Sequence, residues 1–217
     1  RSRGLGDVYK RQGYSRFTGC KNELEASVLT FVPMDDNCEV SQIRLTNKSS
    51  ETKDVSLFSY VEWCLWNADD DSRNFQRNLN TGEVEVIGSA IYHKTEYRER
   101  RNHYAVYSVN APVDGFDTSR DAFLGAYRGV AEPEAVENGK CTNSLASGWS
   151  PIASHQLHMS IAPGETKSFV FVLGYIENPE EEKWESPGVI NKKPAERMLA
   201  KYRTDADVER ACLLYTS

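Results

Sequence analysis

A polar stretch at residues 67–78 holds the densest group of side chains that could do chemistry. Its twelve residues contain three carboxylates, two arginines, three asparagines and one glutamine around the single apolar ring of Phe75. Apolar and polar residues alternate over residues 60–66, before this stretch, and the alternation resumes at Gly82. A long polar excursion between two well-formed strands is where a rigid scaffold usually carries its function. The same composition also fits a solvated hairpin loop, so the pattern alone leaves both interpretations open.

The amides and one arginine of this stretch suit a polyhydroxylated ligand. Asparagine and glutamine offer donors and acceptors together, as sugar hydroxyls require, and the guanidinium of Arg77 can bind a pair of hydroxyls or an anionic phosphate. Trp63, Trp66 and Phe75 could supply a flat apolar face for a pyranose ring. Core packing is the alternative role for the tryptophans, because at least one of Trp63 and Trp66 must point inward from a strand.

Catalysis by paired carboxylates is a weaker interpretation of the same stretch. A glycoside hydrolase needs a carboxylic acid with a raised pKa at a fixed distance from a second carboxylate. The candidates would be Asp69, Asp70, Asp71, Glu62 and Glu83. Three adjacent aspartates in a polar loop are more often turn and capping groups, so we expect them to shape the loop.

Other common chemistries have little support. His155 and His158 lie three apart in a predicted strand and so face opposite sides, while His93 and His103 sit near a basic cluster, so we expect no metal site. The motifs GxSxG, GxxxxGK[ST] and GxGxxG do not occur in the sequence. The basic cluster itself, residues 98–101, could bind an anion, but structural ion pairs or a subunit contact are favoured.

The elements that must position these residues are mostly strands. The pattern predicts strands at residues 24–32, 38–47, 55–66, 82–96, 103–110, 151–161 and 167–176. Residues 39–63 are expected to form a two-strand meander of the kind seen in large antiparallel sandwiches. Residues 167–176 are apolar almost throughout, which predicts a central position in a sheet. Residues 122–127 fit a short strand or one helical turn, and residues 129–148 fit a long surface loop.

The character of the chain changes after residue 176. Residues 177–193 are acidic and then contain proline and lysine, which is typical of a linker. Pro194, followed by Met198, Leu199 and Tyr202, predicts a helix with proline in its first turn.

Composition bounds the class of protein. The 217-residue chain is 39% apolar and 27% charged, values that are ordinary for a soluble globular protein. Its formal net charge of −6 argues against nucleic acid or an anionic membrane surface as the main partner. No apolar run approaches the roughly 18 residues that a membrane span needs. The five cysteines are scattered and never spaced as CxxC, which fits reduced thiols in a cytoplasmic protein.

Both ends of the chain look foreign to the rest. Residues 1–12 have no apolar periodicity, and both they and residues 212–217 resemble peptides translated from sequencing-adaptor DNA. A basic N-terminal arm and a helix end are the alternative. We therefore expect a native sequence that is truncated on both sides, with a partial sandwich domain at residues 13–176 and a linker with its first helix at residues 177–211.

Six longer stretches match one known family. They are VEWCLWN (61–67), NFQRN (74–78), TGEVE (81–85), YHKTEYRERRNHY (92–104), NAPVDGFD (110–117) and SGWSPIASH (147–155). In these stretches the sequence resembles the cellobiose phosphorylase family of inverting disaccharide phosphorylases, and the resemblance spans about residues 13–211. It implies an N-terminal β-sandwich of the supersandwich, galactose-mutarotase-like kind, then a helical linker, then an (α/α)₆ barrel.

The resemblance also implies a reaction. Cellobiose and phosphate give α-glucose 1-phosphate and glucose with inversion, because one aspartic acid protonates the glycosidic oxygen while phosphate attacks from the opposite face. That acid and the main phosphate ligands lie in the barrel, so the resemblance implies no catalytic residue in this chain. It implies no cofactor besides phosphate as co-substrate, β-linked glucosides such as cellobiose as ligands, and a homodimer.

The polar stretch gains a role by the same resemblance. The positions that match Asn67, Asn74, Gln76 and Arg77 reach toward the acceptor sugar. The neighbouring aspartates match the family pattern and hold the shape of the loop, except Asp69, where the family has a larger apolar residue. A stand-alone carbohydrate-binding sandwich, or a glycoside hydrolase that uses residues 69–71, remains the alternative.

Overall fold

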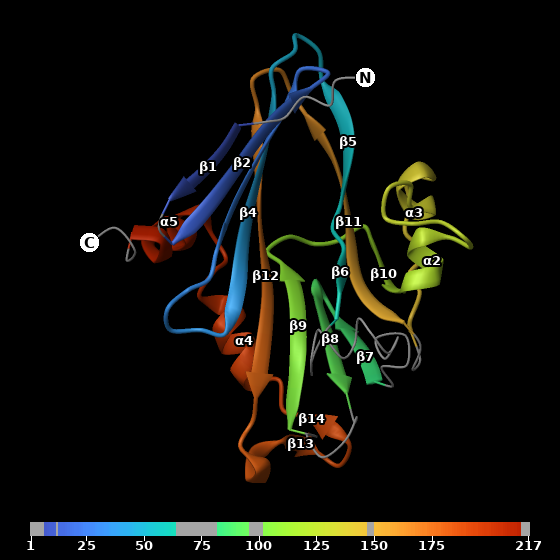
Figure 1. Cartoon of the computed structure of the whole chain (residues 1–217), viewed down its shortest axis with the longest axis vertical. Helices are drawn as coiled ribbons and strands as arrows, with labels where there is room; N and C mark the ends of the chain where they lie inside the picture. Colours follow the sequence, from blue (N-terminus) through green and yellow to red (C-terminus); the bar gives the residue numbers. More distant parts are fainter. Residues whose placement is uncertain (1–6, 12, 64–81, 96–101, 147–149, 214–217) are drawn as a thin grey trace.

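Four layers make up the part of the chain that the structure describes. The computed structural model covers residues 7–11, 13–63, 82–95, 102–146 and 150–213. Its strands and helices are β1 (Asp7–Arg11), β2 (Tyr14–Lys21), β3 (Leu24–Phe31), β4 (Cys38–Asn47), β5 (Lys53–Phe58), β6 (Val61–Glu62), β7 (Gly82–Ile87), β8 (Ala90–Thr95), β9 (His103–Val109), β10 (Gly115–Ser119), α2 (Arg120–Leu124), α3 (Glu134–Glu137), β11 (Pro151–Ile161), β12 (Thr166–Glu177), η2 (Glu180–Glu182), β13 (Trp184–Ser186), β14 (Val189–Ile190), α4 (Lys193–Ala200) and α5 (Asp205–Leu213). Helices α4 and α5 cover one face of a large sheet, a small sheet covers its other face, and α2 and α3 cover the outside of the small sheet (Figure 1). The expected mainly β, antiparallel sandwich is confirmed.

The large sheet has the order β1-β2-β3-β4-β12-β9-β8-β7, and all its neighbouring strands are antiparallel. Strand β12 lies at its centre, between β4 and β9, and both of its faces are covered over Val170–Val172. This explains why residues 167–176 are apolar almost throughout, and their predicted central position is confirmed. The small sheet has the order β10-β11-β5, and β6 also pairs with β11.

Asn47 organises the two turns at which the chain crosses between the sheets. Its buried side chain donates to the carbonyl oxygens of Glu51 (2.7 Å) and Ile161 (2.8 Å) and accepts from the Ser49 N–H (2.9 Å). The first turn joins β4 to β5 and the second joins β11 to β12, and each time the next strand enters the other sheet. The predicted meander over residues 39–63 is therefore wrong, because β4 pairs with β3 and β12 while β5 pairs with β11.

The strand predicted at residues 55–66 is divided into β5 and β6. Both pieces pair with β11 in one continuous register, and the break falls at Ser59. There the Ser59 hydroxyl accepts from the His155 N–H (3.0 Å), in the place that a ladder carbonyl would take. A serine side chain that competes with the backbone in this way interrupts the regular ladder. Residues 64–66 lie outside the described residues.

Three other predictions need correction. Residues 82–95 form a hairpin, β7 and β8, because Gly88 turns the chain with a φ of +60°. Of the two options for residues 122–127, the helical turn is right, since α2 covers Arg120–Leu124. The surface loop predicted at residues 129–148 contains α3, and Asp117 holds part of it by accepting from Thr142 and Ser144.

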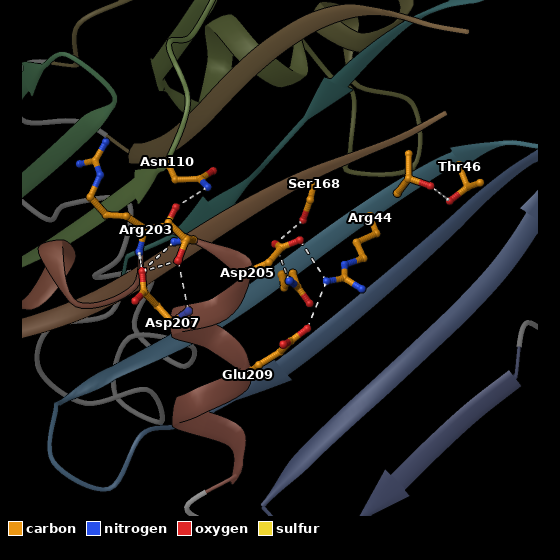
Figure 2. A network of polar contacts seen from close by, with 11 residues as sticks. Arg44, Thr46, Asn110, Ser168, Arg203, Asp205, Asp207 and Glu209 are labelled. Carbon is orange, nitrogen blue, oxygen red and sulfur yellow. Dashed lines mark hydrogen bonds and ion pairs between the residues drawn. The ribbon is translucent and has the colours of Figure 1, made fainter. Parts of the chain in front are cut away.

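The helix predicted at Pro194 is confirmed as α4, and it is followed by a second helix, α5, that was not predicted as a separate element. In α4, Pro194 occupies the first turn, and Ala195 and Met198 are buried against the large sheet. At the start of α5, the Thr204 N–H donates to Asp207 Oδ2 (2.9 Å) and the Asp207 N–H donates to Thr204 Oγ1 (3.2 Å), which forms a capping box. Asp205 fixes α5 to the sheet by accepting hydrogen bonds from β4 and β12 (Figure 2).

Residues 177–193 are packed against the sandwich rather than extended away from it. They contain η2 and the β13–β14 hairpin, and Asn178, Ile190 and Lys192 are buried. At the other end of the chain, β1 pairs with β2 as an edge strand that the sequence pattern did not indicate. The proposed limits of the domain and of the foreign ends stay predictions. None of the helices in the described ranges is long and apolar enough to cross a membrane.

Candidate functional site

The residues predicted to bind sugar lie outside the described residues. This holds for Asn67, Asn74, Gln76 and Arg77, and also for the three aspartates at residues 69–71. The structure does describe both ends of the stretch, from Tyr60 to Trp63 and from Gly82 onward, so the site can be built from its supports.

Trp63 anchors the first end. It follows β6, which pairs with β11 at Ile152 and Ala153, and its side chain is only 5% exposed. The indole stacks on the imidazole of His93, with ring centroids 5.5 Å apart and planes 18° from parallel. Of the two roles open to this tryptophan, core packing is therefore the one observed.

After the stretch, β7 pairs with β8, the strand that carries His93. Gly82 pairs with Thr95, and Val84 lies opposite His93 in the β7–β8 ladder. His93 thus contacts the residue that precedes the stretch and is the ladder partner of a residue that follows it. The residues on either side of 64–81 are thus both held against β8, Trp63 by stacking on His93 and Gly82 by pairing with Thr95.

A polar cluster lies beside the first end. Glu62 Oε1 accepts from the Tyr60 hydroxyl (2.6 Å) and from Arg120 Nε (3.1 Å), and the Tyr60 ring stacks on Phe123 with centroids 5.2 Å apart. Burial, and then the hydrogen bond to Glu62, raises the pKa of Tyr60 well above its usual value. The phenol therefore stays protonated and acts as a donor, and two donors fix the position of the Glu62 carboxylate.

His93 and His155 are buried and neutral. Burial lowers the pKa of His93 and of His155 to about 4, so neither carries charge near neutral pH. His155 Nδ1 contacts the Ser59 hydroxyl (3.2 Å), whereas both ring nitrogens of His93 and Nε1 of Trp63 have no hydrogen-bond partner among the described residues. These groups serve as packing and not as general acids.

Among the described residues, the fold does not bring together ligands for a metal ion or activate a cysteine thiol. His155 is buried and His158 is exposed, so the two face opposite sides of β11 as predicted. Within the described ranges, no three His, Cys, Asp or Glu side chains converge as metal ligands would. Burial raises the pKa of Cys38 and of Cys141 to about 12, which leaves both thiols protonated and unreactive.

Comparison with known proteins fits this architecture. The family model of the glycosyl hydrolase 94 supersandwich domain matches residues 7–205. The chain belongs to the glycosyl hydrolase 94 family. The family expected from the sequence is confirmed at this level, and the two curated relatives named below are disaccharide phosphorylases.

Two curated relatives are phosphorylases, and one solved structure shares the fold. An N,N'-diacetylchitobiose phosphorylase of Vibrio furnissii is 28% identical over 204 residues, which cover 91% of this chain and 23% of that protein. A solabiose phosphorylase of Paenibacillus borealis is 26% identical over 173 residues, covering 77% of this chain and 22% of that protein. A structure assigned as a kojibiose phosphorylase from the human microbiome superposes with a TM-score of 0.52 at 12% identity, covering 94% of this chain and 23% of that one. The chain spans about a quarter of the length of these relatives.

Two residues of the glycosyl hydrolase 94 domain stand out only in three dimensions. Arg120 lies 58 positions from Glu62 along the chain, and His93 lies beyond the polar stretch that it anchors. Neither belongs to a local motif, so no pattern in the sequence could have paired them with Glu62 or Trp63. The resemblance did include His93 within one matching stretch, but it gave no role for it.

Proposed function

We propose that the chain is the N-terminal, non-catalytic domain of an inverting disaccharide phosphorylase. The whole enzyme would cleave a β-linked glucoside such as cellobiose with phosphate, giving α-glucose 1-phosphate and a free sugar. The observation that carries this proposal is the match of residues 7–205 to one domain of a family whose relatives are named phosphorylases. The general acid would come from the remainder of the enzyme, with phosphate as co-substrate and no other cofactor.

The domain's part in the reaction would be to present residues 67–78 to the acceptor sugar. Asn67, Asn74 and Gln76 would exchange hydrogen bonds with sugar hydroxyls, and Arg77 would donate a charge-assisted pair. The fixed ends of this stretch support the proposal, because a site held on rigid strands keeps its geometry better than one on a free loop. We also propose a homodimer and a cytoplasmic location, and the latter agrees with the free thiols of Cys20, Cys38, Cys141 and Cys212.

Sequencing of the neighbouring DNA tests the proposal at its base. We expect an open frame that continues past Ala211 into several hundred residues of helical pattern. A stop codon at that place in the native gene would exclude the phosphorylase and leave a stand-alone carbohydrate-binding sandwich.

Arg77→Ala in the enzyme that contains this domain tests the role of the polar stretch. The loss of a charge-assisted hydrogen bond should raise the KM for the acceptor sugar in the synthetic direction by about 10- to 100-fold, with little change in the KM for glucose 1-phosphate. Arg210→Ala is the matched control, because this arginine lies exposed on α5 and pairs with Asp207. An unchanged acceptor KM and kcat for Arg77→Ala would remove the stretch from the site.

The identity of the acceptor can be measured in the same assay. We expect glucose to be used in preference to N-acetylglucosamine if cellobiose is the natural product of synthesis. The reverse preference would place the enzyme with the chitobiose phosphorylases instead.

A further inference from the structure

An open cavity of about 570 Å³ lies on the face of the large sheet that looks toward the small sheet. Its floor includes Leu173 and Tyr175 of β12, and one wall is formed by Asn37 of the β3–β4 connection and Glu39 at the start of β4. The opposite wall is formed by Glu62 and Trp63 at the end of β6. The volume falls within the range of small-molecule sites, about 300–1,000 Å³.

The cavity exists because the small sheet ends before the large one does. On this face of β12, Phe171 is buried beneath the small sheet, whereas Leu173 and Tyr175, two and four residues further on, are half-buried. The apolar floor is thus open to ligand at a position where the sheet geometry is rigid. Strands β4 and β9 pair with β12 on both sides along this segment.

The lining combines apolar surface with hydrogen-bond acceptors. Glu39 is exposed, and its carboxylate has one long contact, a hydrogen bond from Ser41 Oγ at 3.5 Å. Glu62 is held in place by Tyr60 and Arg120, and the amide of Asn37 adds a donor and an acceptor. Carboxylate and amide oxygens beside aromatic and aliphatic surface are suited to the hydroxyl edge and the C–H face of a pyranose ring.

The charge of the lining selects against anions. Among the described residues that line the cavity there is no lysine or arginine. Asp36, also at the cavity, is already paired with Lys201 on its far side and accepts from the Tyr202 hydroxyl. A phosphate group brought to this floor would meet the carboxylate of Glu39, which no lysine or arginine of the described lining neutralises, whereas Glu62 is already paired with Arg120.

We propose that this cavity binds a neutral pyranoside and rejects sugar phosphates. The proposal does not depend on the phosphorylase activity proposed above, because it rests on described residues of this domain alone. It assigns the domain a sugar-binding surface built from β4, β6 and β12, in addition to residues 67–78.

The test is an amide chemical-shift titration of the ¹⁵N-labelled 217-residue chain. With methyl β-D-glucopyranoside we expect saturable shifts at the amides of Glu39, Leu173 and Tyr175, with an apparent Kd in the millimolar range. With glucose 1-phosphate the apparent Kd should be at least about 5-fold higher. The absence of saturable shifts at these amides, or equal affinity for the two ligands, overturns the proposal.

Two variants of Glu39 sharpen the test. Glu39 is exposed, so its replacement should leave the fold intact, which the dispersion of the amide spectrum checks directly. Glu39→Gln should weaken methyl glucoside binding several-fold and narrow the discrimination against glucose 1-phosphate, and Glu39→Lys should reverse that discrimination. Glu51→Gln, beyond the opposite end of β4, is the matched control and should change neither affinity. Affinities that are identical in all four proteins would exclude Glu39 from the site and overturn the proposal.

The two proposals can fail separately. An enzyme without phosphorolysis would overturn the proposed function and leave the titration of the domain unaffected. Sugar binding that perturbs only amides outside the cavity would overturn this inference and leave the reaction unaffected.

Discussion

Polar side chains on the two faces of the large sheet differ in how fully they are hydrogen-bonded within the fold. On the face covered by α4 and α5, Asp205 accepts from Gln42 (2.6 Å), Arg44 (3.0 Å) and Ser168 (2.6 Å), and Glu209 lies 3.7 Å from the same arginine (Figure 2). On the face toward the small sheet, Glu39 stands open at a cavity. On that face His93 is fully buried, and its ring nitrogens have no partner within the described ranges.

The comparison distinguishes carboxylates that hold the fold together, such as Asp205, from carboxylates that are free to contact a ligand, such as Glu39. Burial opposes the ionisation of Asp205, yet the hydrogen bonds from Ser168 and Gln42 outweigh it and hold the pKa of this carboxyl below its usual value. A carboxylate with all its partners in the fold fixes a helix and has little left for a ligand. Open or unsatisfied polar groups on a rigid sheet are the departure from local consistency that is expected at functional sites. The helix face therefore holds the domain together, and the opposite face carries the candidate sites.

The largest expected effect is acid sensitivity of the face between the sheets. His93 and His155 have folded pKa values of about 4, below the value of about 6.5 expected in the unfolded chain. The unfolded state therefore binds more protons as pH falls, so the free energy of unfolding is intact above pH 6.5 and decreases down to about pH 4. The loss should reach about 3 kcal/mol for each histidine, measured by urea unfolding at a series of pH values.

A pair of variants identifies the source of that sensitivity. His93→Phe keeps an aromatic ring against Trp63 and should reduce the slope of stability against pH by at most about 1.4 kcal/mol per pH unit between pH 6.5 and 4. His155→Phe, at the other histidine whose pKa burial lowers to about 4, should reduce the slope by a similar amount. A slope that His93→Phe does not alter would mean that acid acts elsewhere in the domain.

An intermediate effect is expected on the helix face, where Gly174 lets α4 approach β12. A Cβ at this position would overlap the Met198 Cε methyl and lie 3.2 Å from Val106 Cγ1. Gly174→Ala should therefore cost about 1–3 kcal/mol, and Met198→Ala, which opens a cavity, about 2–5 kcal/mol. Because Met198→Ala makes room for the new methyl, the double variant should be destabilised by at least about 1 kcal/mol less than the sum. Additive costs in denaturant unfolding would contradict this packing.

The smallest effect compares one carboxylate from each face directly. Asp205→Asn should lower the free energy of unfolding by about 1–2 kcal/mol, since its hydrogen bonds are charge-assisted but its side chain is 40% exposed to water. Glu39→Gln should change stability by less than about 0.5 kcal/mol, as is usual for exposed substitutions. Equal costs for the two variants would remove the distinction between the faces.

The sequence predicted an element correctly where the pattern that defines it lies within or next to that element. Strands predicted at residues 38–47 and 151–161 coincide with β4 and β11. The first was predicted from the alternation of its residues, and the second from the turn at residues 162–165 that ends it. The helix at Pro194 was predicted for the same kind of local reason. The resemblance indicated the family and the sandwich, and the family model agrees with it.

These patterns could not predict which strands pair with each other. A polar turn after Asn47 looks the same whether it closes a hairpin or crosses to another sheet, and the buried amide contacts to Glu51 and Ile161 decide for crossing. The break at Ser59 depends in the same way on His155, which is 96 positions distant. Sugar binding by Asn67, Asn74, Gln76 and Arg77 stays a prediction.

Local chemistry and periodicity were enough to determine a β-rich chain, its central strand at residues 167–176 and the helix at Pro194. The stretch suited to sugars stays a prediction. Only the tertiary structure decides which carboxylates accept hydrogen bonds within the fold and which lie exposed at a cavity. Asp205 and Glu39 are both acidic residues in polar surroundings along the chain, and only packing gives one three hydrogen-bond donors and places the other at a cavity. The physical reason is that hydrogen-bond satisfaction depends on neighbours supplied by distant strands and helices, and the sequence around a residue does not specify them.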